Sequence, residues 1–236
     1  MAIALCLGPL NGCSGVSMGV GPFIISMGPP AGTLLYADPG VKIERPGKGL
    51  ITYSAGMELV TGDTVETTQG QAVIDYDDDN AVMLTRATRV QLGSITLFFG
   101  ELFAKIKSIA KKGGGQVVTN ELAASVESTE YGVRRSLVYP PAPVGNVEVY
   151  VRQGRVLCAP GAGARWSPIG LTDNLALDVS GDRAAPAPRS VDARALSRWA
   201  DEAEQRLRKP RKGGTGIGVG IQHRPDRPRG HSIDSK

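Results

Sequence analysis

The run GMELVTGDTVETTQGQAVIDYDDDNAVML, residues 56–84, indicates the fold class, because a short apolar–polar stretch followed by a turn recurs along it. Ala72, Ile74 and Tyr76 alternate with polar neighbours, and an apolar run resumes at Ala81. Alternation with a period of two residues is typical of strands that bury one face. The stretch therefore predicts short β-strands joined by tight turns.

Four aspartates fall within residues 75–79 of this stretch. Alternate acids there resemble the opening of a calcium-binding loop. Such a loop needs a residue free to adopt a positive φ at its sixth position and a bidentate acid at its twelfth, and these positions hold Asn80 and Arg86. Asp and Asn are also favoured between strands, because their side chains hydrogen-bond the local backbone. We therefore predict a structural hairpin turn, with no metal, at Asp77, Asp78 and Asp79.

Three glycine sites are also predicted to be structural turns. The pair Gly62-Asp63 separates strand-like MELV from TVETT, which suits glycine in the strained position and a carboxylate that accepts from backbone N–H groups. Gly100 and Gly154 each separate two apolar runs, and glycine supplies the positive φ that two-residue hairpins need. Nothing near Gly62-Asp63 in sequence supplies a base or a nucleophile.

The composition predicts a thin β-rich core. Of the 236 residues, 41% are hydrophobic but only 5% are aromatic, so the core must be built mainly from Val, Ile, Leu and Ala. Strand-like runs with short connections continue from residue 41 to 181, and short connections favour antiparallel neighbours. We expect an all-β domain over 41–181, a layered sandwich or β-roll of stacked hairpins, with one helix after it.

Residues 1–40 are expected to be a signal-like segment followed by a linker rich in Gly and Pro. The first 15 residues are uncharged and mostly apolar, too short to span a bilayer but of the length of a signal-peptide core. Their end, LNGC, resembles the lipobox of bacterial lipoproteins, which would make Cys13 an acylated first residue of the mature chain. The alternative is a loosely packed or disordered N-terminus.

The C-terminal region divides into a helix over residues 190–209 and a tail over 210–236. The helical period places Leu196, Trp199, Ala203 and Leu207 on one face, with Ser190 as the expected N-cap. We expect this face to dock on the β domain; the alternative is a partner-binding helix. The tail is rich in Gly, Pro and Arg, which predicts disorder.

Charge and residue types narrow the function classes. Residues 1–181 hold 14 basic and 16 acidic side chains, whereas residues 182–236 hold 13 and 7, a net +6. The folded part therefore lacks the basic surface that nucleic-acid binding requires. Both histidines lie in the tail, and the three cysteines have neither zinc nor redox spacing. We expect no catalytic residue, cofactor or metal, and we expect Cys158 to be a buried apolar residue.

Several blocks of residues 41–177 resemble, in order, a FecR-type domain, the periplasmic module of bacterial iron-transport signalling proteins. These blocks are Gly62-Asp63 with the strand–acidic turn that follows, then GELFAKIK, VVTNELAASVESTEYGV and VEVYVRQGRVLC. The resemblance implies an all-β module that acts through protein contacts.

The expected function is therefore that of a non-enzymatic FecR-type protein of the bacterial envelope, a scaffold or signalling module that binds other envelope proteins. It would be periplasmic or held at the membrane only through a lipid on Cys13, and an exposed strand edge is a plausible docking place. The alternative is an envelope adhesive or polyanion-binding protein that uses the basic tail.

Overall fold

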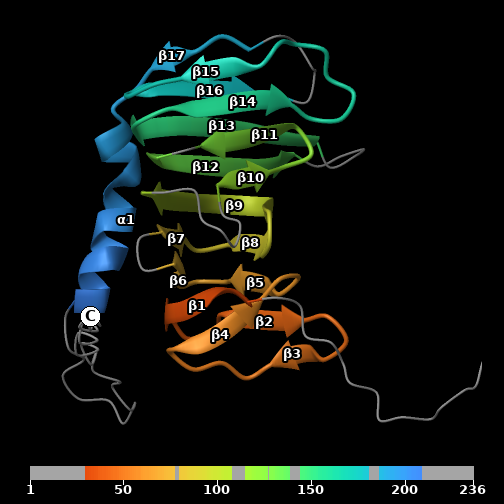
Figure 1. Cartoon of the computed structure of the whole chain (residues 1–236), viewed down its shortest axis with the longest axis vertical. Coiled ribbons are helices and arrows are strands. Elements are labelled where there is room, and N and C mark those ends of the chain that lie inside the picture. The colour runs from red at the N-terminus through yellow and green to blue at the C-terminus, as the bar shows by residue number, and fades with distance from the viewer. Residues whose placement is uncertain are drawn as a thin grey trace, which may run out of the picture.

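The computed structural model describes residues 30–77, 80–107, 115–126, 128–138, 144–180 and 186–208. These residues form 17 strands and one helix, so the expected all-β fold with a C-terminal helix is confirmed. The strands are stacked along the long axis of the molecule and α1 runs beside the stack (Figure 1). Cys13, Asp78, Asp79 and the basic tail lie outside the described residues.

The strands make two sheets that share one apolar core. Sheet A has the order β4 (Met57–Val60), β1 (Pro30–Ala37), β6 (Ala72–Asp77), β7 (Asn80–Leu84), the second half of β9 (Ile95–Ile106), β12 (Thr129–Val138), β13 (Val144–Gln153), β16 (Leu175–Val179) and β17 (Arg189–Ser190). Sheet B has the order β3 (Gly49–Ile51), β2 (Lys42–Arg45), β5 (Thr64–Thr67), β8 (Thr88–Gln91), the first half of β9, β10 (Gln116–Val118), β11 (Leu122–Val126), β14 (Val156–Pro160) and β15 (Ile169–Leu171). All these pairs are antiparallel except β9 with β10.

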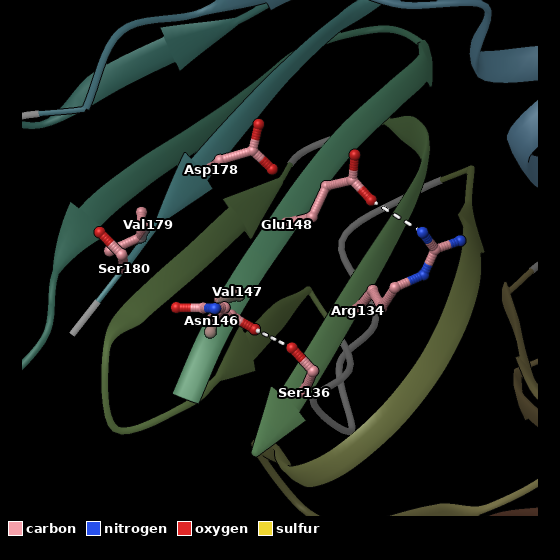
Figure 2. Close-up of a pocket in the computed structure, with 8 residues that line it drawn as sticks. All are labelled: Arg134, Ser136, Asn146, Val147, Glu148, Asp178, Val179 and Ser180. Carbon is pink, nitrogen blue, oxygen red and sulfur yellow. Dashed lines mark hydrogen bonds and ion pairs between the residues drawn. The ribbon is translucent and has the colours of Figure 1, made fainter. Parts of the chain in front are cut away.

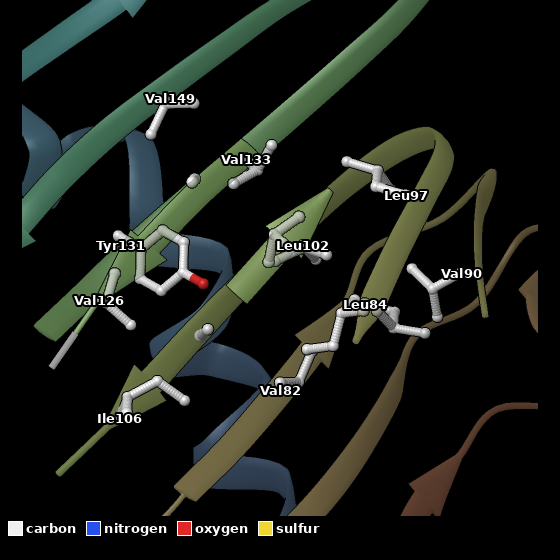
Figure 3. Close-up of a cluster of buried hydrophobic side chains, with 14 of the residues drawn as sticks. Val82, Leu84, Val90, Leu97, Leu102, Ile106, Val126, Tyr131, Val133 and Val149 are labelled. Atoms are coloured by element: carbon white, nitrogen blue, oxygen red, sulfur yellow. The ribbon is translucent and has the colours of Figure 1, made fainter. Parts of the chain in front are cut away.

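Alternation along each strand sends one row of side chains into this core. The row includes Val82 and Leu84 of β7, Leu102 of β9, Tyr131 of β12 and Val149 of β13, which converge between the sheets (Figure 3). These side chains are at most 1% exposed. Burial of aliphatic side chains at about 25 cal/mol per Å² is the main force that holds the two sheets together.

The prediction of two-residue hairpins at Gly100 and Gly154 was wrong. Gly100 (φ 95°) bends the continuous strand β9, whose first half pairs in sheet B and whose second half pairs in sheet A. Gly154 (φ 98°) lies between β13 of sheet A and β14 of sheet B. Both glycines therefore make corners at which the chain passes from one sheet to the other.

Each of these corners is closed by a buried threonine. Thr88 Oγ1 accepts from the N–H of Glu101 (3.0 Å) and donates to its carbonyl (3.1 Å), directly after Gly100. Thr129 Oγ1 does the same with Arg155, directly after Gly154 (3.2 and 2.8 Å). The hydroxyl thus replaces the ladder bonds that are lost where a strand leaves its sheet.

Residues 30–37 correct the expected linker, because they form β1 in the interior of sheet A, between β4 and β6. Pro30 is the first residue of the strand, where a proline is tolerated. Gly32 is there for space: a Cβ at this position would lie 2.7 Å from the carbonyl oxygen of Asp75. The glycine and proline that suggested a flexible arm are therefore features of a packed strand.

Helix α1 (Ala193–Arg208) packs across the outer face of sheet A. It covers an apolar strip of Val73, Met83, Phe103, Tyr150 and Ala176, one residue from each of five strands. Of the predicted docking residues, Ala203 is fully buried against this strip, and Leu196, Trp199 and Leu207 are partly buried against it. The closest part of the contact also uses Ala193, Ser197 and Ala200.

The cap of α1 is Asp192. Its carboxylate accepts from the N–H of Ala195 at 3.0 Å. Ser190, the expected cap, pairs instead with Leu175 in β17. The helix therefore begins three residues later than predicted.

Candidate interaction surfaces

The Gly62-Asp63 turn contains a buried ion pair. The Asp63 carboxylate is fully buried and accepts two bonds from Arg45 of β2, at 2.9 and 2.7 Å, and one from the N–H of Val60 at 3.0 Å. Gly62 has φ 94°. All three of these bonds come from Arg45 or the neighbouring backbone, so the structure gives these residues a role in joining β2 to the β4–β5 connection.

The acidic turn predicted at residues 77–79 connects β6 and β7. These strands pair antiparallel, with Asp77 opposite Asn80. Residues 78 and 79 themselves lie outside the described part of the chain. Asn80 Oδ1 accepts from the N–H of Lys107 at 2.9 Å, which ties the hairpin to the end of β9.

The charged side chains on the outer face of sheet A form a ladder across five strands. Arg134 of β12 donates to Glu101 of β9 (3.1 and 3.2 Å) and to Glu148 of β13 (3.1 Å). Glu148 and Asp178 lie directly opposite each other on β13 and β16, and Arg189 of β17 donates to both. Arg189 thereby offsets the repulsion between two neighbouring carboxylates.

A concavity of about 390 Å³ lies beside this ladder (Figure 2). Arg134, Glu148 and Asp178 form one side of it, and Ser136 and Asn146 lie further along the same strands. The Arg134 guanidinium is directed at Glu148, as the dashed line shows. Because the charged groups of the concavity are engaged with one another, their evident role is to hold β9, β12, β13, β16 and β17 in register.

Glu101 also anchors α1. One of its oxygens accepts from Trp199 Nε1 at 3.1 Å and from the Tyr150 hydroxyl at 3.0 Å. Burial raises the pKa of Tyr150 and the Glu101 carboxylate raises it further, so the phenol stays a hydrogen-bond donor. Sequence analysis identified Trp199 as a docking residue but missed Glu101, because the helical period carries no information about the strand it meets.

Two more ion-pair groups fix the middle of the helix. Lys105 of β9 pairs with Glu204 at 2.6 Å, and Arg152 of β13 pairs with Asp201 at 2.7 Å. The outer face of sheet A is thus occupied by α1 along one strip and by paired charges along another.

A second buried ion pair joins sheet A to sheet B. Arg135 of β12 donates to Glu121 at 2.7 and 2.8 Å, and both side chains are less than 10% exposed. Burial acts to raise the pKa of Glu121, but the hydrogen bonds and charge of Arg135 outweigh it and lower this pKa overall. Glu121 also accepts from the N–H of Gly145 at 3.0 Å.

The free edges of both sheets are short. The terminal strands β3, β4, β15 and β17 have three, four, three and two residues. At the β17 edge, the register Ala176 opposite Arg189 would next place Pro188 opposite Leu177, and proline has no N–H to donate. Short and proline-blocked edges discourage the addition of a further strand, which weighs against the expected docking at an edge.

The outer face of sheet B differs from that of sheet A. Strands β10, β11, β14 and β15 and the first half of β9 contain no Asp, Glu, Lys or Arg. Three of the four exposed large apolar side chains lie on the outer face of this sheet: Leu50 on β3, Phe98 on β9 and Leu157 on β14, which are 70%, 38% and 44% exposed. No helix among the described residues covers this face, because the single helix lies on sheet A.

We call the upper part of this surface the uncharged face. It consists of the outward side chains of β9, β10, β11, β14 and β15, namely Thr96, Phe98, Gln116, Val118, Ala123, Ser125, Leu157, Ala159 and Gly170. Cross-strand pairs place Ala123 opposite Ala159 and Ser125 opposite Leu157. Small side chains therefore occupy its centre.

Two arginines border the uncharged face. Arg89 lies over the Phe98 ring, 5.9 Å from its centroid, and is paired with Glu66 at 3.2 Å. Arg155 lies beside Gly170, where its Nη2 would be 3.4 Å from an added Cβ. Among the described residues no carboxylate forms an ion pair with Arg155.

The described residues show neither a metal-binding cluster, nor a membrane-spanning helix, nor a reactive thiol. Within the described ranges, no three His, Cys, Asp or Glu side chains come together as a metal would require, and α1 is neither long nor apolar enough to cross a membrane. Cys158 is buried between the sheets, and burial raises its pKa to about 12. A thiol with this pKa is a poor nucleophile near neutral pH.

No protein-family model and no curated protein sequence matches the chain. Among solved structures it is similar to two crystal structures of a Parabacteroides distasonis ATCC 8503 protein provisionally described as an anti-sigma factor. The TM-scores are 0.46 and 0.45 at 16% and 17% identity. Each match covers 58% of this chain and 64% or 63% of the other, less than two thirds of either.

Proposed function

We propose that the chain is a non-enzymatic, FecR-type protein-interaction module of the bacterial envelope, with a scaffolding or signalling role. The observation that carries the proposal is the unequal treatment of the two sheets. Sheet A is covered by α1 and by paired charges, whereas none of the elements that the structure describes covers the uncharged face of sheet B, where Phe98 and Leu157 are exposed. Exposed apolar side chains on an otherwise ordered face are typical of protein contacts.

The charged groups support an interaction role over a catalytic one. Catalysis requires a titratable group that can exchange a proton with substrate. In the concavity beside the charge ladder, however, Arg134 and Glu148 are hydrogen-bonded to each other and to neighbouring charges of the ladder. Moving either side chain toward a substrate would break the contacts that join β12 to β13.

The envelope assignment rests on the N-terminal sequence and on the resemblance of residues 41–177 to FecR-type domains. It is tested by intact-mass measurement of the protein purified from native membranes. A mass that fits cleavage before Cys13 with added lipid supports the assignment. An unmodified chain that begins at Met1 in the cytoplasm contradicts it.

The basic tail is the competing contact surface, because residues 210–236 hold six basic and two acidic side chains, a net +4. The two functions are separated by crosslinking in the producing cells, with the full chain and with a variant that lacks residues 210–236. Capture of a protein partner that survives the deletion supports the β domain as the binding module. Capture that is lost, and that in the full chain weakens steeply with salt, favours the polyanion-binding alternative.

A further inference from the structure

We propose that the uncharged face of sheet B is a docking site for an amphipathic α-helix of a partner protein, one that carries a small and apolar stripe and a carboxylate that meets Arg155. This inference rests on the proposed protein-binding function and names its surface and partner class. It follows from the shape of the face, from its lack of charge, and from Arg155 at its border, which has no ion-pair partner within the described part of the chain.

The shape of the face suits a helix. Its centre is formed by Val118, Ala123, Ser125 and Ala159, which leave the surface low, while Phe98 and Leu157 stand at diagonally opposite corners. Phe98 on β9 and Leu157 on β14 are three strand spacings apart, about 14 Å at ~4.8 Å per spacing. A helix with its side chains is about 10–12 Å wide, so it can lie between these two side chains.

Helix α1 shows how such a face is covered in this molecule. On the opposite sheet, small residues of α1, namely Ala193, Ala200 and Ala203, sit directly against the strands. An added strand is a poorer candidate, because the backbone groups on a sheet face are already bonded within the sheet and the sheet edges are short.

Charge selects among possible helices. The face carries no ionisable side chain, so a charged stripe would lose its hydration without compensation. Arg89, at one border, already has Glu66 as its partner. Arg155, at the other border, has none among the described residues, and it is exposed beside Leu157 and Gly170. A carboxylate at the end of the apolar stripe would meet this guanidinium.

The same feature argues against a second copy as the occupant. In a face-to-face dimer each copy would present the same uncharged residues, and the face supplies no carboxylate for Arg155 of the other copy. Five strands at ~4.8 Å and about five residues at ~3.4 Å give a face of roughly 400 Å². A stable protein pair buries about 800 Å² on each side, whereas a single helix needs far less surface.

The proposal is tested by site-specific photo-crosslinking of the full chain in the producing cells. The photoreactive residue p-benzoylphenylalanine replaces Ser125, at the centre of the uncharged face, or Ser136, an exposed serine on the outer face of sheet A that serves as the matched control. Mass spectrometry of the crosslinked peptide identifies the partner segment. That segment is then synthesised with a fluorophore, and its affinity is measured by anisotropy against the full chain.

The expected result is a crosslink from Ser125, and not from Ser136, to a helix-forming segment with small or apolar residues at i, i+3 and i+4 and an acid at one end. Ala123→Lys should weaken binding of its peptide about tenfold or more, because a desolvated charge would enter the contact. Arg155→Glu should also weaken it, and replacing the peptide's acid by Arg should restore the affinity. Ser136→Lys should leave it unchanged, and equal thermal midpoints verify that the variants are folded.

Three outcomes overturn the docking proposal: a crosslink from Ser125 to a second copy of this chain, a crosslink to a segment that binds in an extended form, or no rescue by the charge swap. If a partner is captured from Ser136 alone, the docking site is wrong but the protein-binding function stands. If neither position captures a protein, both proposals fail.

Discussion

Replacing Gly100 with alanine tests how much the close packing of Gly100 against Thr88 contributes to the stability of the strand corner. Gly100 has φ 95°, and an added Cβ would lie 2.4 Å from the Thr88 Cα, from Thr88 Oγ1 and from the Ala87 carbonyl oxygen. Two of these three atoms belong to the backbone, so no rotamer change can remove the clash. The positive φ costs an alanine about 1–2 kcal/mol, and overpacking adds about 1–3 kcal/mol.

Gly56 provides the matched control. It also has a positive φ, 83°, but an added Cβ there would meet nothing within 4 Å. Gly56→Ala should therefore lose only the conformational part, about 1–2 kcal/mol. Gly100→Ala should lose about 3–5 kcal/mol, because moving Thr88 away from the new methyl group also strains its two bonds to Glu101.

The measurement is urea unfolding of the full chain, followed by tryptophan fluorescence, since Trp166 is only 6% exposed. The free energy of unfolding of each variant is compared with that of the parent at equal m-value. If Gly100→Ala costs no more than Gly56→Ala, the close approach of Thr88 to the corner contributes nothing and the reasoning is refuted.

Three further perturbations follow from buried groups. Arg45→Met should cost about 3–5 kcal/mol in urea unfolding, because Asp63 remains buried without its partner; a loss below about 1 kcal/mol would contradict a buried pair. Arg135 lowers the pKa of Glu121 in the folded protein, so the contribution of this ion pair to the free energy of unfolding is complete above about pH 4.5 and is lost as the pH falls through the lower folded-state pKa. Glu121→Gln should remove this part of the acid dependence of the thermal midpoint, and an unchanged pH profile would count against the prediction. Cys158 should resist iodoacetamide at pH 8 in the native chain and react once urea unfolds it, as read by peptide mass mapping; rapid native labelling would show that the thiol is accessible.

The sequence was sufficient for the fold class because strand alternation is a local signal. Ile74 and Val82, on neighbouring strands, face the core as their pattern indicates. The passage between sheets was not predictable in the same way. Gly100 and Gly154 each lie between two apolar runs, so their local sequences are alike. The threonines that close their corners lie 12 and 25 residues upstream, at no common spacing. A glycine between two apolar runs was therefore interpreted as a hairpin.

The first strand was missed for a related reason. The Pro–Gly composition of residues 29–40 suggests a linker, and only the packing of Gly32 against the Asp75 backbone shows why glycine is required within β1. Composition indicates only the intrinsic conformational preference of a segment. Residues 30–37 form a strand because β4 and β6 hydrogen-bond to β1 on both sides. Local propensity gives way to tertiary context here.

The uncharged face could not be predicted for a third reason: strand alternation does not show which sheet face the helix covers. Phe98 and Leu157 sit in strands of the same alternating type as Phe103 and Tyr150. Phe103 and Tyr150 are buried because α1 crosses their outward side, while Phe98 and Leu157 face away from sheet B and stay exposed. The sequence contains one amphipathic helix and two sheet faces with apolar outward residues, and only coordinates assign the helix to one of them. With the edges short and sheet A occupied, the uncharged face is where a partner can bury apolar surface without first displacing any of the strands or the helix described in residues 30–208.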